Sequence, residues 1–211
     1  MSVRTRVKIC GITRPEDAEK AVELGADAIG LVFCDASPRA VDIREARAVV
    51  AAVPAFVSVV GLFVDPKPGQ VEVALEALHL DTLQFHGNES PELCRYYERR
   101  YVKAVPMGGG VDPHDYVASY PDASGFLFDS HRVGERGGRG EAFDHGAIPG
   151  GEVRGLTVAG GLTPDNVADV IRRVRPFAVD VSSGVEARPG EKDRERLARF
   201  IAEVERGDRD S

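Results

Sequence analysis

Eight short runs of apolar and β-branched residues recur along the chain, and segments with helical patterning lie between them. The runs predict strands over 6–10, 28–33, 56–64, 82–86, 101–106, 125–129, 155–159 and 177–181. Such an alternation folds either into a closed (β/α)8 barrel or into an open, doubly wound parallel sheet. The strand number and the length of 211 residues both match the barrel, and no glycine-rich dinucleotide-binding turn follows the first strand. We therefore expect an α/β protein built as a (β/α)8 TIM barrel.

The helical segments and the absence of linkers fit this architecture. The predicted helices cover 15–24, 43–52, 68–78, 91–99, 113–120, 164–173 and 193–205. Several of them carry proline near the first turn, where its missing N–H costs nothing, and Thr13 is the expected N-cap of the first helix. No shift in composition divides the chain, so we expect residues 1–211 to form a single domain whose last few residues are frayed.

Composition excludes several classes of function. Hydrophobic residues make up 43% and charged residues 29% of the chain, as in a typical soluble protein. No apolar run approaches the ~20 residues of a membrane span, and the first residues do not resemble a secretory signal. We therefore expect a cytoplasmic protein with no membrane partner, and a monomer because most barrels of this type work as single domains. A net charge of −7 disfavours nucleic-acid binding. Three widely spaced cysteines fit neither a disulfide framework nor a zinc motif, so free thiols are expected.

Reactive residues follow many of the predicted strands. In a barrel of this type the active site lies at the C-terminal ends of the strands. The candidates at these ends are Cys10, Arg39, His86, Asp129, Gly160, Gly161, Asp180, Ser183 and Gly184. They are far apart in sequence, but the barrel would bring them to one face. Their convergence carries more weight than any single residue.

Cys10 and Asp129 are the candidates for acid–base chemistry. Strand alternation places Lys8 and Cys10 on the same side of the first strand, where a nearby cation could lower the pKa of the thiol and make it a base or a nucleophile. The alternative for Cys10 is a small core residue. Asp129 ends an apolar strand, so we expect a partly desolvated carboxyl with a raised pKa that can act as a general acid. The alternative for Asp129 is a helix or loop cap.

Two glycine-rich strand ends predict a phosphate site. Gly160 and Gly161 follow the seventh strand, and Ser183 and Gly184 follow the eighth, where barrels of this type usually bind phosphate. Arg39 could pair with a substrate carboxylate in fork geometry, although most arginines of this chain are expected at the surface. His86 stands alone as a possible metal ligand, and no metal site is expected.

The combined motifs resemble the phosphoribosylanthranilate isomerase family over about residues 7–193. The segments that carry the resemblance are Lys-Ile-Cys-Gly-Ile-Thr at 8–13, Gly-Leu-Val-Phe at 30–33, Ser-Pro-Arg at 37–39, Gln-Phe-His-Gly at 84–87, Gly-Gly-Arg-Gly-Glu-Ala-Phe-Asp at 137–144, Ala-Gly-Gly-Leu-Thr-Pro-Asp-Asn-Val at 159–167, Val-Asp-Val-Ser-Ser-Gly-Val-Glu at 179–186 and Pro-Gly-Glu-Lys-Asp at 189–193. The family is a (β/α)8 barrel that uses neither a cofactor nor a metal.

The resemblance implies an Amadori rearrangement of the phosphosugar N-(5′-phosphoribosyl)anthranilate in tryptophan biosynthesis. By analogy, Asp129 is the general acid that protonates the ring oxygen, and the Cys10 thiolate is the base that removes the C2′ proton. Arg39 would hold the anthranilate carboxylate, and the glycine-rich strand ends the phosphate. His86 and Asp180 would belong to the substrate pocket.

The chain departs from the family pattern at two positions, and other functions stay open. Arg139 stands where the family usually has a small hydroxyl residue, and His145 where it usually has tryptophan. Both positions lie in the loop after the sixth strand.

The alternative functions are another phosphosugar enzyme, such as an indole-glycerol-phosphate synthase or a pentose-phosphate epimerase, and a non-catalytic phosphate-binding barrel. The synthase needs catalytic lysines and glutamates at strand ends, and only Lys8 and Lys103 lie in predicted strands. The epimerase needs metal ligands.

Overall fold

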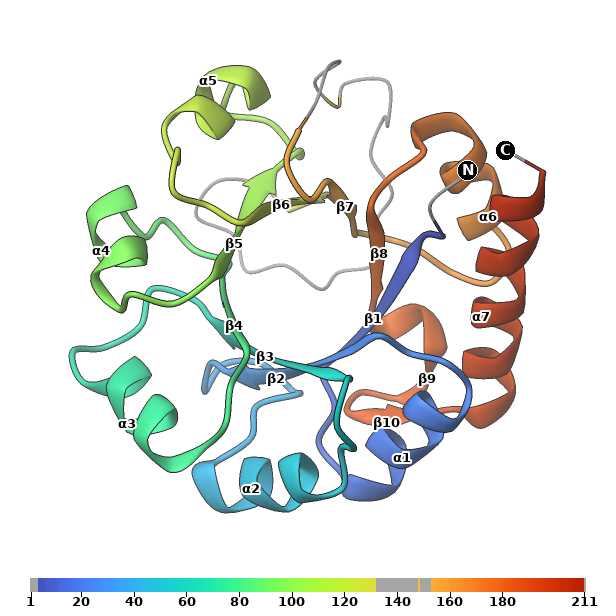
Figure 1. The fold of residues 1–211 in the computed structure, drawn as a ribbon, viewed down its shortest axis with the longest axis horizontal. Coiled ribbons are helices and arrows are strands. Elements are labelled where there is room, and N and C mark those ends of the chain that lie inside the picture. Colours follow the sequence, from blue (N-terminus) through green and yellow to red (C-terminus); the bar gives the residue numbers. More distant parts are fainter. Residues whose placement is uncertain (1–3, 132–147, 149–152, 211) are drawn as a thin grey trace.

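Eight parallel strands close into a barrel in the computed structural model, which describes residues 4–131, 148 and 153–210 (Figure 1). The strands are β1 (Arg6–Cys10), β2 (Ala28–Phe33), β3 (Ser58–Phe63), β4 (Thr82–Phe85), β5 (Tyr101–Pro106), β6 (Gly125–Asp129), β7 (Thr157–Val158) and β8 (Ala178–Val181). They pair in sequence order, and β8 pairs with β1 to close the ring. The predicted (β/α)8 barrel is therefore confirmed.

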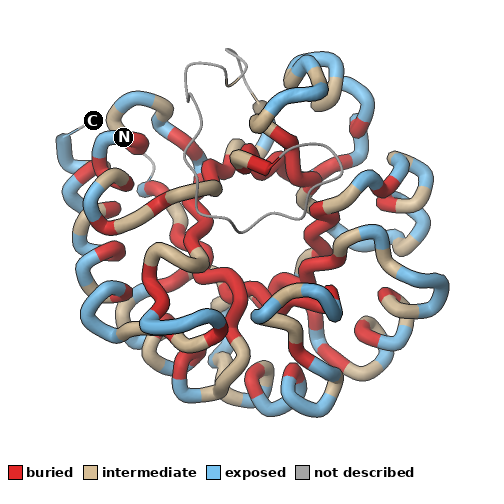
Figure 2. The backbone as a smooth tube through the Cα atoms, turned by 180° about the vertical axis from the view of Figure 1, so that it is seen from behind, coloured by how far each residue is buried: buried red, intermediate tan, exposed pale blue. Residues whose placement is uncertain are grey.

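The helices surround the barrel (Figure 1). They are α1 (Pro15–Glu23), α2 (Ile43–Ala51), α3 (Gln70–Ala77), α4 (Pro91–Tyr96), α5 (Pro113–Ala118), α6 (Val167–Val174) and α7 (Arg194–Arg209). Figure 2 shows buried residues on the strands and on the barrel-facing side of the helices, while exposed residues face outward. No helix in the described part of the chain is long and apolar enough to cross a membrane.

Strand alternation separates two sets of buried side chains. Residues such as Ile9 and Phe85 belong to the main core cluster, which fills the space between the barrel and the helices. The alternate residues point into the barrel, where Ala104, Leu127 and Ala159 form a small apolar cluster. Lys8, Cys10 and Asp129 belong to this inward set, because successive side chains of a strand point to opposite faces.

Several element boundaries differ from the sequence prediction. Strand β3 begins at Ser58 rather than at residue 56, because Phe56 has a φ of 73°, which is left-handed and incompatible with a strand. Helix α6 begins at Val167 rather than at residue 164. The Asn166 side chain instead ties the preceding turn together, accepting from Thr163 N and donating to the Gly161 carbonyl. The predicted cap Thr13 is not the N-cap of α1, since Arg14 occupies that position.

A short hairpin after β8 is absent from the sequence prediction. A 3-10 turn, η2 (Ser183–Val185), leads into β9 (Glu186–Arg188) and β10 (Glu191–Lys192), which pair antiparallel. Pro189 and Gly190 form the turn, and Gly190 has a φ of 81° that glycine adopts without strain. The hairpin brings two buried charged side chains, Glu186 and Lys192, together, and Glu186 contacts Arg39 in the loop after β2.

Candidate active site

A cavity of about 340 Å³ lies at the C-terminal ends of the strands, within the size range of small-molecule sites. Its described lining includes Cys10, Arg39, His86, Asp129, Gly160, Gly161, Asp180 and Ser183. These residues come from six different strand ends or the loops that follow them. Of the candidates named from the sequence, only Gly184 is not part of the lining. A Cβ atom at Gly184 would lie 2.0 Å from the Leu162 carbonyl oxygen, so this glycine permits close backbone packing behind the cavity.

Cys10 lies beside a buried ion pair. The Lys8 Nζ atom donates to Asp180 Oδ1 at 2.9 Å, and register places Lys8 next to Asp180 and Cys10 next to Gly30. A Cβ atom at Gly30 would lie 2.9 Å from Cys10 Sγ. The missing side chain at Gly30 therefore leaves room for the thiol on the neighbouring strand.

Burial raises the pKa of the Cys10 thiol, and the Lys8 ammonium opposes this shift without overcoming it. The Asp180 carboxylate, which neutralises Lys8, adds to the upward shift. A thiolate would need the opposite balance. The raised pKa of Cys10 therefore favours the protonated thiol at neutral pH, although the sequence places a cation beside it.

Asp129 lies against two histidines. Its Oδ2 atom is 2.9 Å from His86 Nε2 and 3.5 Å from His131 Nδ1, and all three side chains are buried. Gln84, two residues before His86 on the same face of β4, places its Nε2 atom 3.0 Å from His86 Nδ1. As placed, Gln84 donates to Nδ1, which leaves the imidazole proton on Nε2, where it is donated to Asp129.

The pKa of Asp129 corrects an expectation from the sequence. Burial raises the pKa of this carboxyl, as expected, but the imidazoles of His131 and His86 that lie against it outweigh burial and hold the pKa well below its usual range. The lowered pKa favours an ionised Asp129 at neutral pH, whereas the sequence predicted a raised pKa. Burial also lowers the pKa of His131, so His131 is neutral at pH 7.

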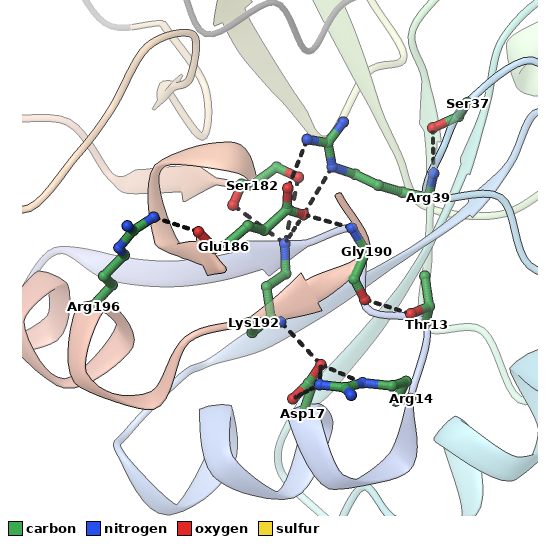
Figure 3. Close-up of polar contacts among 10 residues, drawn as sticks. All are labelled: Thr13, Arg14, Asp17, Ser37, Arg39, Ser182, Glu186, Gly190, Lys192 and Arg196. Carbon is green, nitrogen blue, oxygen red and sulfur yellow. Dashed lines mark hydrogen bonds and ion pairs between the residues drawn. The ribbon is translucent and has the colours of Figure 1, made fainter. Parts of the chain in front are cut away.

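Arg39 is held by an acidic partner rather than being free at the cavity (Figure 3). Its Nε and Nη2 atoms donate to the two carboxylate oxygens of Glu186 at 2.8 and 2.7 Å. Lys192 Nζ binds the same carboxylate at 2.7 Å. The fork that the sequence assigned to a substrate carboxylate is thus occupied by Glu186, while Nη1 and the second N–H of Nη2 make no contact with Glu186.

The glycine-rich turn after β7 has a left-handed backbone. Gly160 and Gly161 have φ values of 77° and 64°, which turn the backbone after β7 in a way that side chains disfavour. A Cβ atom at Gly160 would lie 2.7 Å from Asp129 Oδ1 and from the Ser130 amide nitrogen. The absent side chain therefore lets this turn lie directly against the Asp129 carboxylate.

Lys103 has a structural role. Its Nζ atom binds Glu89 at 3.0 Å and the Gly87 carbonyl at 2.7 Å, and both charged side chains are fully buried. Lys103 does not line the cavity. Lys8 is paired with Asp180. Neither Lys8 nor Lys103 is therefore free to act as the catalytic lysine that an indole-glycerol-phosphate synthase needs.

The sequence did not predict four residues that contact the predicted site residues or their partners. These residues are Gln84, His131, Glu186 and Lys192. Gln84 and His131 each lie two residues from a predicted residue, His86 or Asp129, and i±2 spacing is the signal that places them on the same side. Glu186 and Lys192 fall in segments that carry the family resemblance, but no local pattern pairs them with Arg39. The departures at Arg139 and His145 lie outside the described residues.

Comparisons with known proteins agree on one family. A model of the N-(5′-phosphoribosyl)anthranilate (PRA) isomerase family matches residues 7–203. The chain is 85% identical over 206 residues to N-(5′-phosphoribosyl)anthranilate isomerase of Halorhodospira halophila, covering 98% of this chain and 99% of the relative. Monomers of the dimeric phosphoribosylanthranilate isomerase from Thermotoga maritima superpose with a TM-score of 0.80 at 37% identity, covering 95% and 98% of the two chains. A phosphoribosyl anthranilate isomerase in complex with reduced 1-(o-carboxyphenylamino)-1-deoxyribulose 5-phosphate gives 0.77 at 37% identity with the same coverage.

Proposed function

Because the chain belongs to the N-(5′-phosphoribosyl)anthranilate isomerase family, we propose that Cys10 and Asp129 divide the acid–base steps of that reaction between them. The chain is an isomerase of tryptophan biosynthesis. It catalyses the Amadori rearrangement of N-(5′-phosphoribosyl)anthranilate to 1-(2-carboxyphenylamino)-1-deoxyribulose 5-phosphate. The observation that carries the proposal is that a thiol and a carboxyl from opposite parts of the chain line one cavity.

The reaction needs one acid and one base. Asp129 gives a proton to the furanose ring oxygen as the bond from that oxygen to C1′ breaks, which leaves an iminium ion. The iminium makes the C2′ proton acidic, and the Cys10 thiolate removes it. The resulting enolamine tautomerises to the amino-ketose. Every step is a proton transfer or a bond rearrangement within the substrate, so the proposed chemistry uses no cofactor and no metal.

The pKa shifts of Cys10 and Asp129 favour a proton on the thiol rather than on the carboxyl. Catalysis needs protonated Asp129 and ionised Cys10, whereas the pKa of Cys10 is raised and that of Asp129 lowered. A proton must therefore be transferred to the Asp129 carboxyl before turnover. The profile of kcat/KM against pH is then bell-shaped. Its acid limb belongs to Asp129 with its two histidines, its alkaline limb belongs to Cys10, and both values are properties of the coupled set.

Alkylation of Cys10 tests this proton assignment without substrate. The rate of reaction with iodoacetamide, followed by mass spectrometry of the peptide that carries Cys10, should rise with pH to a midpoint above the ordinary thiol value of about 8.5. The sign follows from burial, which disfavours the thiolate. In a Lys8→Met control the midpoint should move further up, because the opposing cation is gone. A wild-type midpoint below that of an ordinary thiol would contradict the assignment.

The rest of the cavity fits the two ends of the substrate. Val32, Cys34 and Leu62 form an apolar cluster with Cys10, which suits the flat anthranilate ring. We assign the anthranilate carboxylate to Arg39 and the phosphate to the cradle formed by Gly160, Gly161 and Ser183. Gly184 supports the cradle by letting the backbone approach Leu162. Asp180 holds Lys8, and His86 holds Asp129.

Replacing Arg39 by methionine should raise KM more than it lowers kcat, because Arg39 binds a part of the substrate that does not react. One charge-assisted hydrogen bond is worth about 1.5–3 kcal/mol, which corresponds to an increase in KM of about 10- to 150-fold. Steady-state kinetics with anthranilate fluorescence as the readout would measure it. An unchanged KM would show that Arg39 serves only to hold Glu186.

We further propose that one chain suffices for activity, as a single-domain monomer in the cytoplasm. The proposal is supported by a barrel that one chain closes by itself, through the pairing of β8 with β1.

A further inference from the structure

We propose that His86, Asp129 and His131 form a binding site for a divalent transition-metal ion such as Zn²⁺, and that the bound ion inhibits the isomerase. The three residues are called the His–Asp–His cluster below. One ligand atom from each lies within 4.8 Å of the other two, and their exposed fractions are only 7%, 5% and 8%. The cluster lies at the edge of the cavity, since His86 and Asp129 line it.

The donor set selects the class of metal. Two imidazole nitrogens and one carboxylate oxygen are ligands that Zn²⁺ prefers, and such a set leaves a fourth position open for water. Mg²⁺ and Ca²⁺ prefer oxygen ligands, so a set with two nitrogens disfavours them. We therefore expect Zn²⁺ and its neighbours in the transition series to bind, and Mg²⁺ not to compete with them.

The spacing of the ligand atoms suits a small ion. Asp129 Oδ2 lies 2.9 Å from His86 Nε2 and 3.5 Å from His131 Nδ1. A tetrahedral ion with bonds of 2.0–2.1 Å separates its ligand atoms by about 3.3–3.4 Å. These two separations lie on either side of this value, and all three ligand atoms lie within 4.8 Å of one another. Rotations of the side chains would therefore bring the three atoms around one ion.

His131 supplies an observation that points to a ligand independently of the cluster geometry. Its Nδ1 atom is buried and has no hydrogen-bond partner within the described part of the molecule. Buried polar atoms without a partner are uncommon and call for an explanation. The mechanism assigns no proton transfer to this nitrogen. Nδ1 faces Asp129 Oδ2 at 3.5 Å, so an ion that replaces any proton on this nitrogen would be shared with that carboxylate.

Gln84 provides the outer support that a histidine ligand needs. Metal-bound histidines usually use their second nitrogen in a hydrogen bond that fixes the ring. Gln84 contacts His86 Nδ1 at 3.0 Å and is itself buried. When the ion binds the lone pair of His86 Nε2, the imidazole proton moves to Nδ1. The side-chain amide of Gln84 then flips, so that its oxygen accepts a hydrogen bond from Nδ1.

Inhibition follows from the role of Asp129, so this part of the inference rests on the proposed function. An ion bound to the carboxylate occupies the lone pairs that would carry the catalytic proton, and it also blocks the edge of the cavity. The ion takes no part in the reaction. Binding itself does not depend on the catalytic role of Asp129, so binding and inhibition are measured separately.

Binding is tested by titrating the purified protein with Co²⁺ and Zn²⁺. Co²⁺ should bind with one ion per chain and without the near-ultraviolet charge-transfer band of a thiolate ligand. Loss of an outer-shell partner alone weakens metal binding about 10- to 100-fold, so His131→Asn should weaken it by at least that factor. His79→Asn is the matched control, because His79 is exposed, and it should leave the affinity unchanged. His131→Gln serves as a second variant if His131→Asn does not fold.

Inhibition is tested with the same variants, each compared with its own rate in the presence of EDTA. Zn²⁺ should inhibit the wild type reversibly, and the inhibitory concentration should rise in His131→Asn by the factor found for binding. The site is ruled out if no ion binds, if a thiolate band appears, or if His131→Asn binds as tightly as the wild type. Binding as expected without inhibition would overturn the inhibitory role and would also count against Asp129 as the acid.

Discussion

Replacing Cys10 by serine should reduce kcat about 10²- to 10⁴-fold, the range that general acid–base catalysis contributes, while KM changes little. Serine is close in size to cysteine, so the shape of the cavity is retained. Its hydroxyl, however, has a far higher pKa than a thiol and is a poor base at neutral pH. Anthranilate fluorescence during turnover would report the loss.

The matched control for Cys10→Ser is Cys34→Ser. Cys34 is a second buried thiol that lines the same cavity, and we assign it no proton transfer. Its replacement should lower kcat by a much smaller factor. If both variants behaved alike, or if Cys10→Ser kept nearly full turnover, Cys10 would not be the base.

Replacing Asp129 by asparagine should also reduce kcat about 10²- to 10⁴-fold. The amide preserves the shape of the carboxyl but cannot deliver a proton, so opening of the furanose ring becomes rate-limiting. An open-chain analogue of the substrate, which is already past that step, should be affected much less by the substitution. Steady-state rates of wild type and variant on both substrates provide the test.

Asp129→Asn also changes the contacts of two histidines, so its effect on stability needs its own measurement. The variant loses a charged acceptor beside His86 and His131. Thermal unfolding monitored by circular dichroism would show whether the barrel still folds. Equal losses on the ring-closed and open-chain substrates, in a folded variant, would contradict a role in ring opening.

Much of the fold could be predicted from the sequence because most strands have a clear local pattern of apolar residues. The observed bounds of β1, β2, β5 and β6 are those predicted, and each of these strands is an uninterrupted apolar or alternating run. The position of Cys10 at the end of β1 and of Asp129 at the end of β6 follows directly. Parallel closure then brings both ends to one face of the barrel.

The electrostatics of the site could not be predicted in the same way. Burial of Asp129 was readable from its apolar strand, but His131 and His86 together reverse the direction of the pKa shift, and His86 lies 43 residues away in the chain. The partner of Arg39 is even more remote, since Glu186 is separated from it by 147 residues. Local sequence patterns do not specify contacts of this kind. They depend on the closed barrel and on the hairpin of β9 and β10.

The division of roles between Cys10 and Asp129 is tested most directly with substrate deuterated at C2′. In Cys10→Ser, removal of the C2′ proton limits the rate, so a large primary isotope effect on kcat is expected. In Asp129→Asn, ring opening precedes that step and limits the rate, so the isotope effect should disappear. A large isotope effect in both variants, or in Asp129→Asn alone, would contradict the assignment of Asp129 as the acid and Cys10 as the base.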